Sequence, residues 1–73
     1  MSNANRQRLN ELPSDVSRRI DDTIQDIAEG IIEGIDLPNL GGSAYSNAYG
    51  DRIVYDLAKG NLIVLGFSTV EDL

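Results

Sequence analysis

A chain of 73 residues is expected to form one domain, residues 1–73, with little stability in reserve, because short chains bury only about 60% of their unfolded surface. It contains neither cysteine nor histidine, which excludes disulfides, thiolate metal sites and histidine-based acid–base catalysis. Twelve acidic residues against six basic ones give a net charge of −6, which opposes binding to nucleic acid and to anionic membranes.

Residues 1–12 are polar, and they are expected to form a tail or a short helical turn anchored by Leu9 and Leu12. The opening stretch MSNANRQRLN lacks the apolar core of a secretory signal, and no run of 18 apolar residues occurs in the chain. A sequence without cysteine also fits the reducing cytosol. We therefore expect a cytoplasmic protein that does not act at a membrane.

The next segment carries the strongest periodic signal. Its apolar residues recur at steps of three and four, which places them on one stripe of an amphipathic α-helix: Val16, Ile20, Ile24, Ile27, Ile31 and Ile35. Pro13 and Ser14 suit a helix start, and we predict a helix over about 13–35. Gly30 and Gly34 are unfavourable inside it, so either the last turns are loose or another backbone comes close there.

Residues 43–67 predict a three-stranded antiparallel meander. The first strand, SAYSNAY, alternates poorly, but Tyr45 and Tyr49 would share a face in an extended chain. Gly50 and Asp51 then turn the chain.

The two following strands have clearer patterns. RIVYDL alternates between apolar and other positions, which indicates a strand with one face in the core. The loop AKGN indicates a tight turn that contains Gly60 and Asn61, both of which tolerate positive φ. LIVLGF is almost wholly apolar, which predicts a central strand covered on both faces. Ser68 and Glu71 have capping-box spacing, which predicts a short C-terminal turn.

The predicted helix and sheet differ in length. A helix of about 23 residues would be ~35 Å long, whereas strands of six or seven residues reach only ~20–23 Å. The sheet therefore cannot cover the whole isoleucine stripe. The uncovered part must pack against the N-terminal segment, a second copy or a partner, and uncovered apolar surface usually marks an interface.

Four carboxylates on the predicted helix step by four, three and four residues and form a ridge away from the isoleucines: Asp22, Asp26, Glu29 and Glu33. This ridge is either a solvated outer face or a docking site for a basic partner. A metal site is not expected, because helical carboxylates without histidine rarely close a coordination shell. Tyr45 and Tyr49 are candidate interface residues for the same partner, with a place in the core as the alternative.

No catalytic group is expected. The stretch Gly41-Gly42-Ser43 lacks the lysine and the following helix of a phosphate loop. A Ser–Lys pair would depend on Lys59, which lies in a tight turn. A carboxylate pair of the glycosidase kind needs a concave pocket that so small a domain can hardly form.

The segments LPSDVSRRIDDTIQDIAEG and LGGSAYSNAYGDRIVYDLAKGNLIVLGFSTVEDL resemble the later part of the RelE/ParE toxin superfamily, over about residues 12–70. Members have a helix, a glycine-bearing strand, an Arg–apolar–apolar–Tyr strand and, after a turn, an apolar strand. The matching elements here are Gly42, Arg52-Ile53-Val54-Tyr55, Gly60 and Leu62-Ile63-Val64-Leu65. Of the basic residues on which ribonuclease members rely, Arg52 alone has a counterpart, and the terminal His or Tyr has none. The resemblance therefore implies a binding scaffold rather than an active ribonuclease.

We therefore expect a small acidic α+β domain, one long helix packed on a three-stranded meander, that binds protein and is not an enzyme. The expected partner is a basic or nucleic-acid-binding protein, without direct contact to nucleic acid or membrane, and no cofactor is expected. This profile is typical of phage inhibitors of host defence nucleases (anti-CRISPR proteins among them), antitoxins and small regulators. Two alternatives stay open: a RelE/ParE-like fold with residual ribonuclease activity, and a structural homo-oligomer, such as a dimer, with paired isoleucine stripes.

Overall fold

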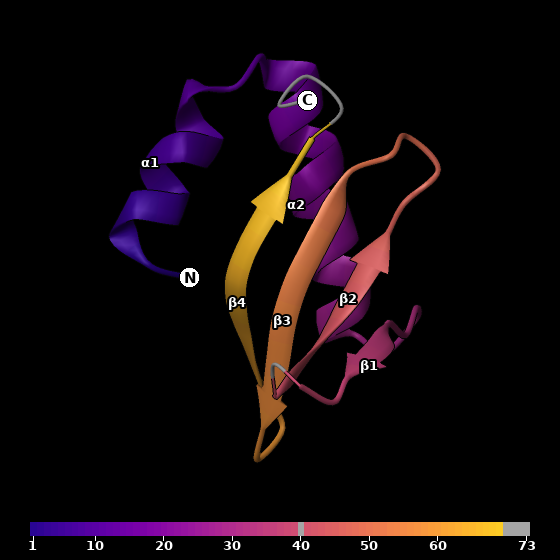
Figure 1. Cartoon of the computed structure of the whole chain (residues 1–73). Helices are drawn as coiled ribbons and strands as arrows, with labels where there is room; N and C mark the ends of the chain where they lie inside the picture. Colours follow the sequence, from indigo (N-terminus) through magenta and orange to yellow (C-terminus); the bar gives the residue numbers. More distant parts are fainter. Residues whose placement is uncertain (40, 70–73) are drawn as a thin grey trace.

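The computed structural model describes residues 1–39 and 41–69 (Figure 1). Two helices precede four strands, which form one antiparallel sheet in the order β1-β2-β3-β4. The elements are α1 (Asn3–Glu11), α2 (Ser14–Ala28), β1 (Ile35–Leu37), β2 (Gly42–Ser46), β3 (Arg52–Ala58) and β4 (Asn61–Ser68). The α+β class is as predicted, with one helix and one strand more than expected. The predicted C-terminal turn extends to Glu71, outside the described residues.

Helix α1 occupies the segment where a tail or a short turn was expected. Its start is capped by the Ser2 hydroxyl, which accepts a hydrogen bond from the Asn5 N–H at 3.2 Å. Its single fully buried side chain is Leu9, which belongs to the core cluster. The helix was missed because one buried leucine among polar residues produces no helical periodicity.

The helix predicted over 13–35 ends early, because Gly30 adopts the left-handed conformation with φ +73°. The Gly30 N–H donates to the Ile27 carbonyl at 3.1 Å, and the Ile31 N–H donates to the Asp26 carbonyl at 3.0 Å. These two hydrogen bonds form a Schellman motif, which terminates a helix at glycine. The last two isoleucines of the predicted stripe therefore lie outside the helix, and both are exposed.

Gly34 permits the additional strand β1 to approach the rest of the sheet. Its N–H donates to the Tyr55 hydroxyl at 2.8 Å. A Cβ atom at this position would lie 2.6 Å from both the Ala44 carbonyl oxygen and the Tyr55 hydroxyl. Of the two explanations offered by the sequence, close backbone approach is the one that applies at Gly34.

Strand β4 lies at an edge of the sheet, so the prediction of a central strand covered on both faces is wrong. Helix α1 runs beside this edge (Figure 1). The Asn5 side-chain amide donates to the Leu65 carbonyl at 3.1 Å, and the Arg8 guanidinium donates to the Phe67 carbonyl. Side chains of α1 therefore occupy acceptors that an unprotected edge would offer to another strand.

The turn between β3 and β4 has positive φ at Lys59 (53°) and Gly60 (81°), with Ala58 paired to Asn61. Two consecutive left-handed residues are typical of a two-residue type I′ hairpin. The sequence correctly located the turn, and Gly60 has the positive φ that it was expected to tolerate. The other residue with positive φ is Lys59, while Asn61 begins β4. Further along the pair, a β-bulge shifts the register opposite Val54 and Tyr55.

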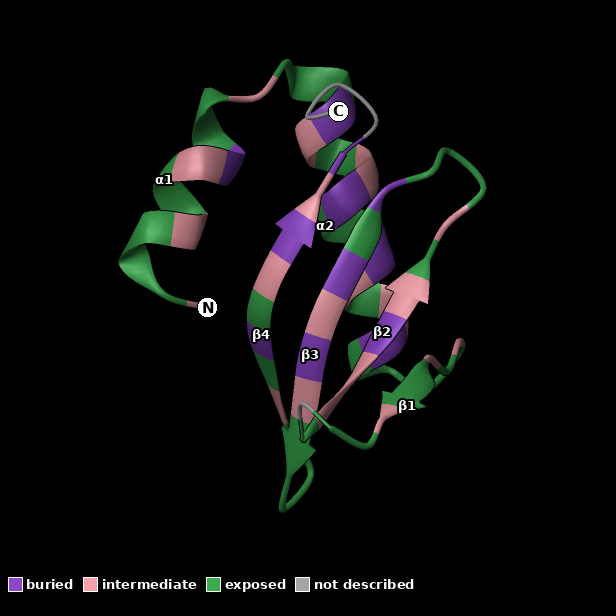
Figure 2. Cartoon of the chain, in the orientation of Figure 1, coloured by how far each residue is buried: buried purple, intermediate pink, exposed green. Residues whose placement is uncertain are grey.

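One face of the sheet packs against α2, and buried positions alternate along β3 (Figure 2). The buried core cluster draws on both helices and two strands: Leu9, Val16, Ile20, Ile27, Ile53, Tyr55, Val64 and Phe67. The N-terminal segment therefore supplies part of the cover that the isoleucine stripe was expected to need. Neither helix in the described part of the chain is long and apolar enough to cross a membrane.

Candidate functional site

The outward surface of α2 is strongly acidic. We define the acidic face of α2 by its carboxylates Asp15, Asp21, Asp22, Asp26 and Glu29. All of them are exposed except Asp26, which is half-buried at the side of the helix. The buried positions Val16, Ile20 and Ile27 point the other way, toward the sheet.

The four carboxylates of the predicted ridge do not stay together. Asp22 and Asp26 lie on α2, and Glu29 is its C-terminal cap residue. Glu33 lies beyond the helix, in the segment that leads to β1, because the chain leaves the helical path at Gly30. The structure therefore separates Glu33 from the other three.

The two candidate tyrosines are also separated. Tyr45 lies on β2 and is half-buried against the core cluster. Tyr49 lies in the loop after β2 and is 63% exposed. The expectation of a shared strand face was wrong because β2 ends at Ser46 and the chain turns immediately afterwards.

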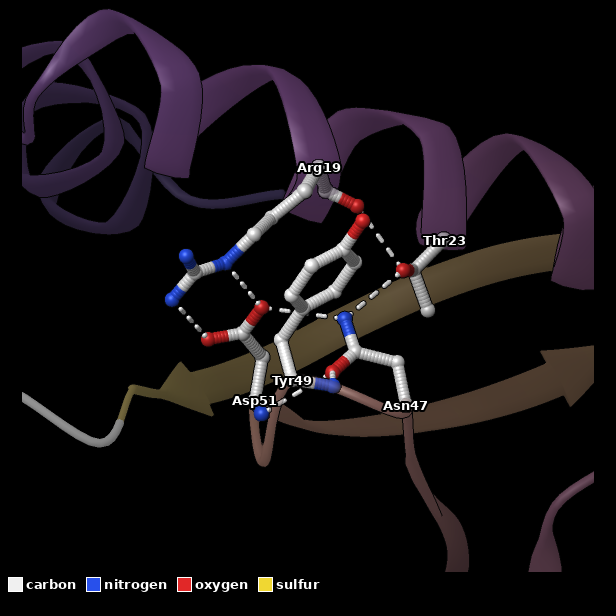
Figure 3. Close-up of polar contacts among 5 residues, drawn as sticks. All are labelled: Arg19, Thr23, Asn47, Tyr49 and Asp51. Carbon is white, nitrogen blue, oxygen red and sulfur yellow. Dashed lines mark hydrogen bonds and ion pairs between the residues drawn. The ribbon is translucent and has the colours of Figure 1, made fainter.

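A buried ion pair, which the sequence did not reveal, fastens α2 to the loop between β2 and β3 (Figure 3). Asp51 is completely buried, and its carboxylate accepts two hydrogen bonds from Arg19, from Nε at 2.7 Å and from Nη2 at 3.0 Å. The Arg19 guanidinium also lies over the Tyr49 ring, 5.1 Å from its centroid. We call Arg19, Thr23, Asn47, Tyr49 and Asp51 the polar clasp.

Asn47 completes the clasp, because its side chain forms hydrogen bonds both with its own loop and with α2. Its side-chain nitrogen donates to the Asp51 carboxylate at 2.9 Å and to the Thr23 hydroxyl at 3.1 Å. Its side-chain oxygen accepts from the Tyr49 N–H at 2.9 Å and the Asp51 N–H at 3.0 Å. Thr23 in turn donates to the Arg19 carbonyl at 2.8 Å. These hydrogen bonds and the ion pair offset the free-energy cost of burying the Asp51 carboxylate.

The electrostatics of the clasp favour a charged Asp51. Hydrogen bonding from Arg19 is the largest influence and holds the pKa of Asp51 below its ordinary value, with Asn47 and the Arg19 charge acting in the same direction. Burial acts in the opposite direction and raises the pKa, but the net result is a lowered pKa. The clasp is therefore a charged structural tie rather than a proton donor poised near neutral pH.

The sheet face turned away from α2 is uncovered by any described element (Figure 1), and we call it the outer sheet face. Because Ile53 and Tyr55 are buried, strand alternation places Arg52, Val54 and Asp56 on the outer sheet face. None of these three makes a hydrogen bond or ion pair through its side chain with the part of the chain described.

Neighbouring strands extend the outer sheet face with apolar side chains. Ala44 pairs with Val54, and Ile35 pairs with Ala44. Ile63 pairs with Asp56, and Leu65 lies at the bulge of β4. A shallow hollow of about 500 Å³ opens over the β1 side of this face, where Ile35, Leu37, Ala44 and Arg52 contribute to its lining. Such a surface is suited to contact another apolar surface.

The remaining chemistry is sparse. Among residues 1–39 and 41–69, no three acidic side chains are placed to hold a metal ion together. A second open hollow, of about 440 Å³, is lined by β1, the connection from β1 to β2, the start of β2 and the second half of β3, and Glu33, Asp36 and Tyr55 contribute to its lining. The structural features that stand out are thus two surfaces, the acidic face of α2 and the outer sheet face.

No family model matches this chain, and no curated protein or solved structure matches it either. The resemblance to the RelE/ParE superfamily therefore stays a prediction.

Proposed function

We propose that this chain is a non-enzymatic protein-binding domain, an inhibitor or regulator that covers a basic surface of a larger partner with the acidic face of α2. This description fits two classes of protein. One is antitoxins, and the other is phage proteins that inhibit host defence nucleases. The partner would be a protein whose own ligand is anionic, such as nucleic acid, because its basic groove would accept carboxylates in place of phosphates.

The observation that carries the proposal is the inward orientation of Arg19. Helix α2 contains two arginines, Arg18 and Arg19, and the second is directed to the buried Asp51. Arg18 is then the one cation on the helix that faces outward with the carboxylates. The clasp thus leaves the helix surface more negative than its sequence composition alone indicates.

The neighbourhood of the carboxylates supports a role in contact rather than in folding. Asp15, Asp21 and Asp22 are exposed and make no ion pair with the described residues. Surface carboxylates without partners contribute little to stability, typically less than ~0.5 kcal/mol each. Their replacement is therefore expected to change binding without unfolding the chain.

The test replaces three exposed carboxylates of the acidic face together, as Asp21→Asn, Asp22→Asn and Glu29→Gln. Immobilised wild-type and variant chains are compared for proteins captured from an extract of the cell that naturally makes this protein. We expect the variant to lose at least ~10-fold of the captured partner, because several charge contacts act together. Capture by the wild type should also weaken as NaCl rises above ~0.15 M, since exposed ion pairs are screened.

A matched control removes the same charge elsewhere, as Glu11→Gln, Glu33→Gln and Asp36→Asn. All three residues are exposed and lie outside α2. This control should capture the same partner as the wild type. Equal losses in both variants would show that net charge, and not the acidic face, governs capture, and equal retention in both would refute the proposal.

A RelE/ParE-like ribonuclease is the alternative function. What favours it is that Arg52, the one residue with a counterpart in that resemblance, is exposed and free of ion pairs with the described residues. An RNA cleavage assay with the wild type and Arg52→Ala decides between the two. Cleavage that depends on Arg52 would replace the binding proposal, and absence of cleavage would remove the alternative.

A further inference from the structure

The outer sheet face is apolar at its centre and lies on the side of the sheet opposite α2 (Figure 1). Ile35 is 77% exposed, Leu65 51% and Ile63 42%, and they lie on strands to either side of β3, which carries the half-buried Val54. Large apolar side chains gathered on one open sheet face are the usual partners of a second sheet, which would pack about 10 Å away.

The two charges on this face are arranged about Val54. Arg52 and Asp56 lie two residues before and two residues after Val54 on the same strand. They are therefore about 13 Å apart, with Val54 midway, at ~3.3 Å per residue. The arrangement is a positive end, an apolar centre and a negative end along β3.

This pattern is complementary to its own reversed copy. A two-fold axis that lies between two facing sheets, perpendicular to the strands, reverses the strand direction of the second copy. With the axis at Val54, Arg52 of each copy faces Asp56 of the other, and the apolar centres meet. Self-complementarity of this kind is the requirement for a closed two-fold interface.

We propose that the outer sheet face binds the same face of a second copy of this chain, with the two β3 strands antiparallel and Val54 at the two-fold axis. Charge distribution supports a second copy as the occupant. The chain as a whole carries −6, so most approaches of two copies are repulsive. On β3 the outer sheet face balances one arginine against one carboxylate, and Glu33 borders the hollow beside Arg52. This face is less negative than the acidic face of α2, so two copies that meet through it repel each other less.

The size of the face sets the expected strength. Four strands about 4.8 Å apart, and strands of up to ~23 Å, make a face of only a few hundred Å². This area is below that of standard stable interfaces, which bury about 800 Å² per partner. We therefore expect a weak dimer, with a dissociation constant of roughly 1 μM or higher.

The dimer is independent of the proposed function, because α2 lies on the other side of the sheet. Both acidic faces would point away from the interface and remain available to a partner. A failure of the dimer would leave binding by α2 untouched, and the reverse also holds.

The test is sedimentation equilibrium from about 10 μM to 1 mM with charge-reversal variants. Arg52→Asp gives a face with two negative ends, and Asp56→Arg gives one with two positive ends. Each variant alone should dimerise at least ~10-fold more weakly than the wild type, because like charges face each other. An equimolar mixture of the two should regain the wild-type average mass, since the two variant faces are complementary. Weakening by each reversal alone, together with recovery in the mixture, indicates antiparallel stacking, because parallel stacking would already place like charges opposite each other in the wild type.

Matched controls reverse charges on α2 instead. Arg18→Asp and Asp21→Arg change the net charge by the same amounts, and both residues are exposed away from the sheet. They should leave dimerisation within ~3-fold of the wild type. Circular dichroism verifies that each variant is folded, and the pair Arg52→Glu and Asp56→Lys replaces any that is not.

Three results would overturn the inference. The first is a wild-type chain that stays monomeric up to 1 mM, which would leave the face to a different protein. The second is a dimer that both single reversals leave intact. The third is a mixture of the two reversals that stays monomeric while each variant is folded.

Discussion

Replacing Asp51 by alanine should destabilise this protein far more than any exposed carboxylate replacement. The substitution removes the two Asp51 carboxylate oxygens that accept hydrogen bonds from the Arg19 guanidinium, whose side chain is 20% exposed. It also removes the carboxylate that accepts from Asn47. Arginine and asparagine groups that were paired inside the fold are then left without that partner, and the loop between β2 and β3 loses its tie to α2.

The magnitude follows from the burial of the two partners. Removing one partner of a buried ion pair costs about 3–5 kcal/mol. Because Arg19 retains some access to water, we expect the lower end, about 3 kcal/mol. A chain of 73 residues has a total stability of roughly 4–11 kcal/mol. At about 4–8 °C per kcal/mol for a domain of this size, the melting temperature should fall by roughly 12–24 °C.

Thermal and urea unfolding, followed by circular dichroism at a few μM protein, measure the effect. Asp21→Ala is the control, since Asp21 is exposed on α2 and should cost less than about 0.5 kcal/mol. A double-mutant cycle with Arg19→Ala should give a coupling of about 2 kcal/mol between Arg19 and Asp51. Equal costs for Asp51→Ala and Asp21→Ala, or a coupling near zero, would refute this account of the clasp.

Two further predictions concern the same fold. Because the pKa of Asp51 is lowered in the folded state, its contribution to stability is present above the ordinary pKa of about 3.9 and is lost as the pH falls through the lowered value. The difference in unfolding free energy between wild type and Asp51→Asn should therefore shrink below about pH 4, and a difference independent of pH would contradict this. Gly34→Ala should cost about 1–3 kcal/mol, because its Cβ would lie 2.6 Å from the Tyr55 hydroxyl and from a β2 carbonyl. Gly66→Ala is the control, because nothing lies within 4 Å of its Cβ position; similar unfolding midpoints in urea for the two variants would refute close approach at Gly34.

The elements that the sequence predicted are those with a dense local pattern. The alternation of RIVYDL and the run LIVLGF correctly indicated β3 and β4, and the spacing of Val16, Ile20 and Ile27 correctly indicated the buried side of α2. The run LIVLGF did not reveal that β4 is an edge strand, because an unbroken apolar run has the same appearance in a central strand and in an edge strand with one open face.

The elements that were missed lack such a pattern or depend on distant contacts. Helix α1 has one buried leucine, and β1 is three residues long and is held by pairing to β2. Gly30 did carry a usable signal, because a glycine after a periodic segment is the usual end of a helix. The isoleucine spacing beyond it outweighed that signal in the prediction.

Sequence spacing located only those candidate site residues that are close together in the chain. Asp22 and Asp26 lie on α2 and Glu29 caps its end, as the helical spacing predicted, while Glu33 lies beyond the helix, which had already ended. Asp51 and Arg19 are 32 residues apart, and no short-range pattern connects a turn aspartate to a particular helix arginine. The clasp and the outer sheet face both depend on contacts between residues that are distant in the sequence, and short-range sequence patterns do not predict such contacts.

Carboxylate footprinting of the captured complex tests the central claim most directly. Free and partner-bound chains are labelled with a carbodiimide and an amine, and the labelling rate of each carboxylate is read by mass spectrometry. We expect Asp15, Asp21 and Asp22 on the acidic face to label at least ~5-fold more slowly in the complex, because a basic surface covers them. Glu11, which is exposed on α1, should label at the same rate in both states. Unchanged labelling across α2 in a complex that protects carboxylates elsewhere would contradict the account.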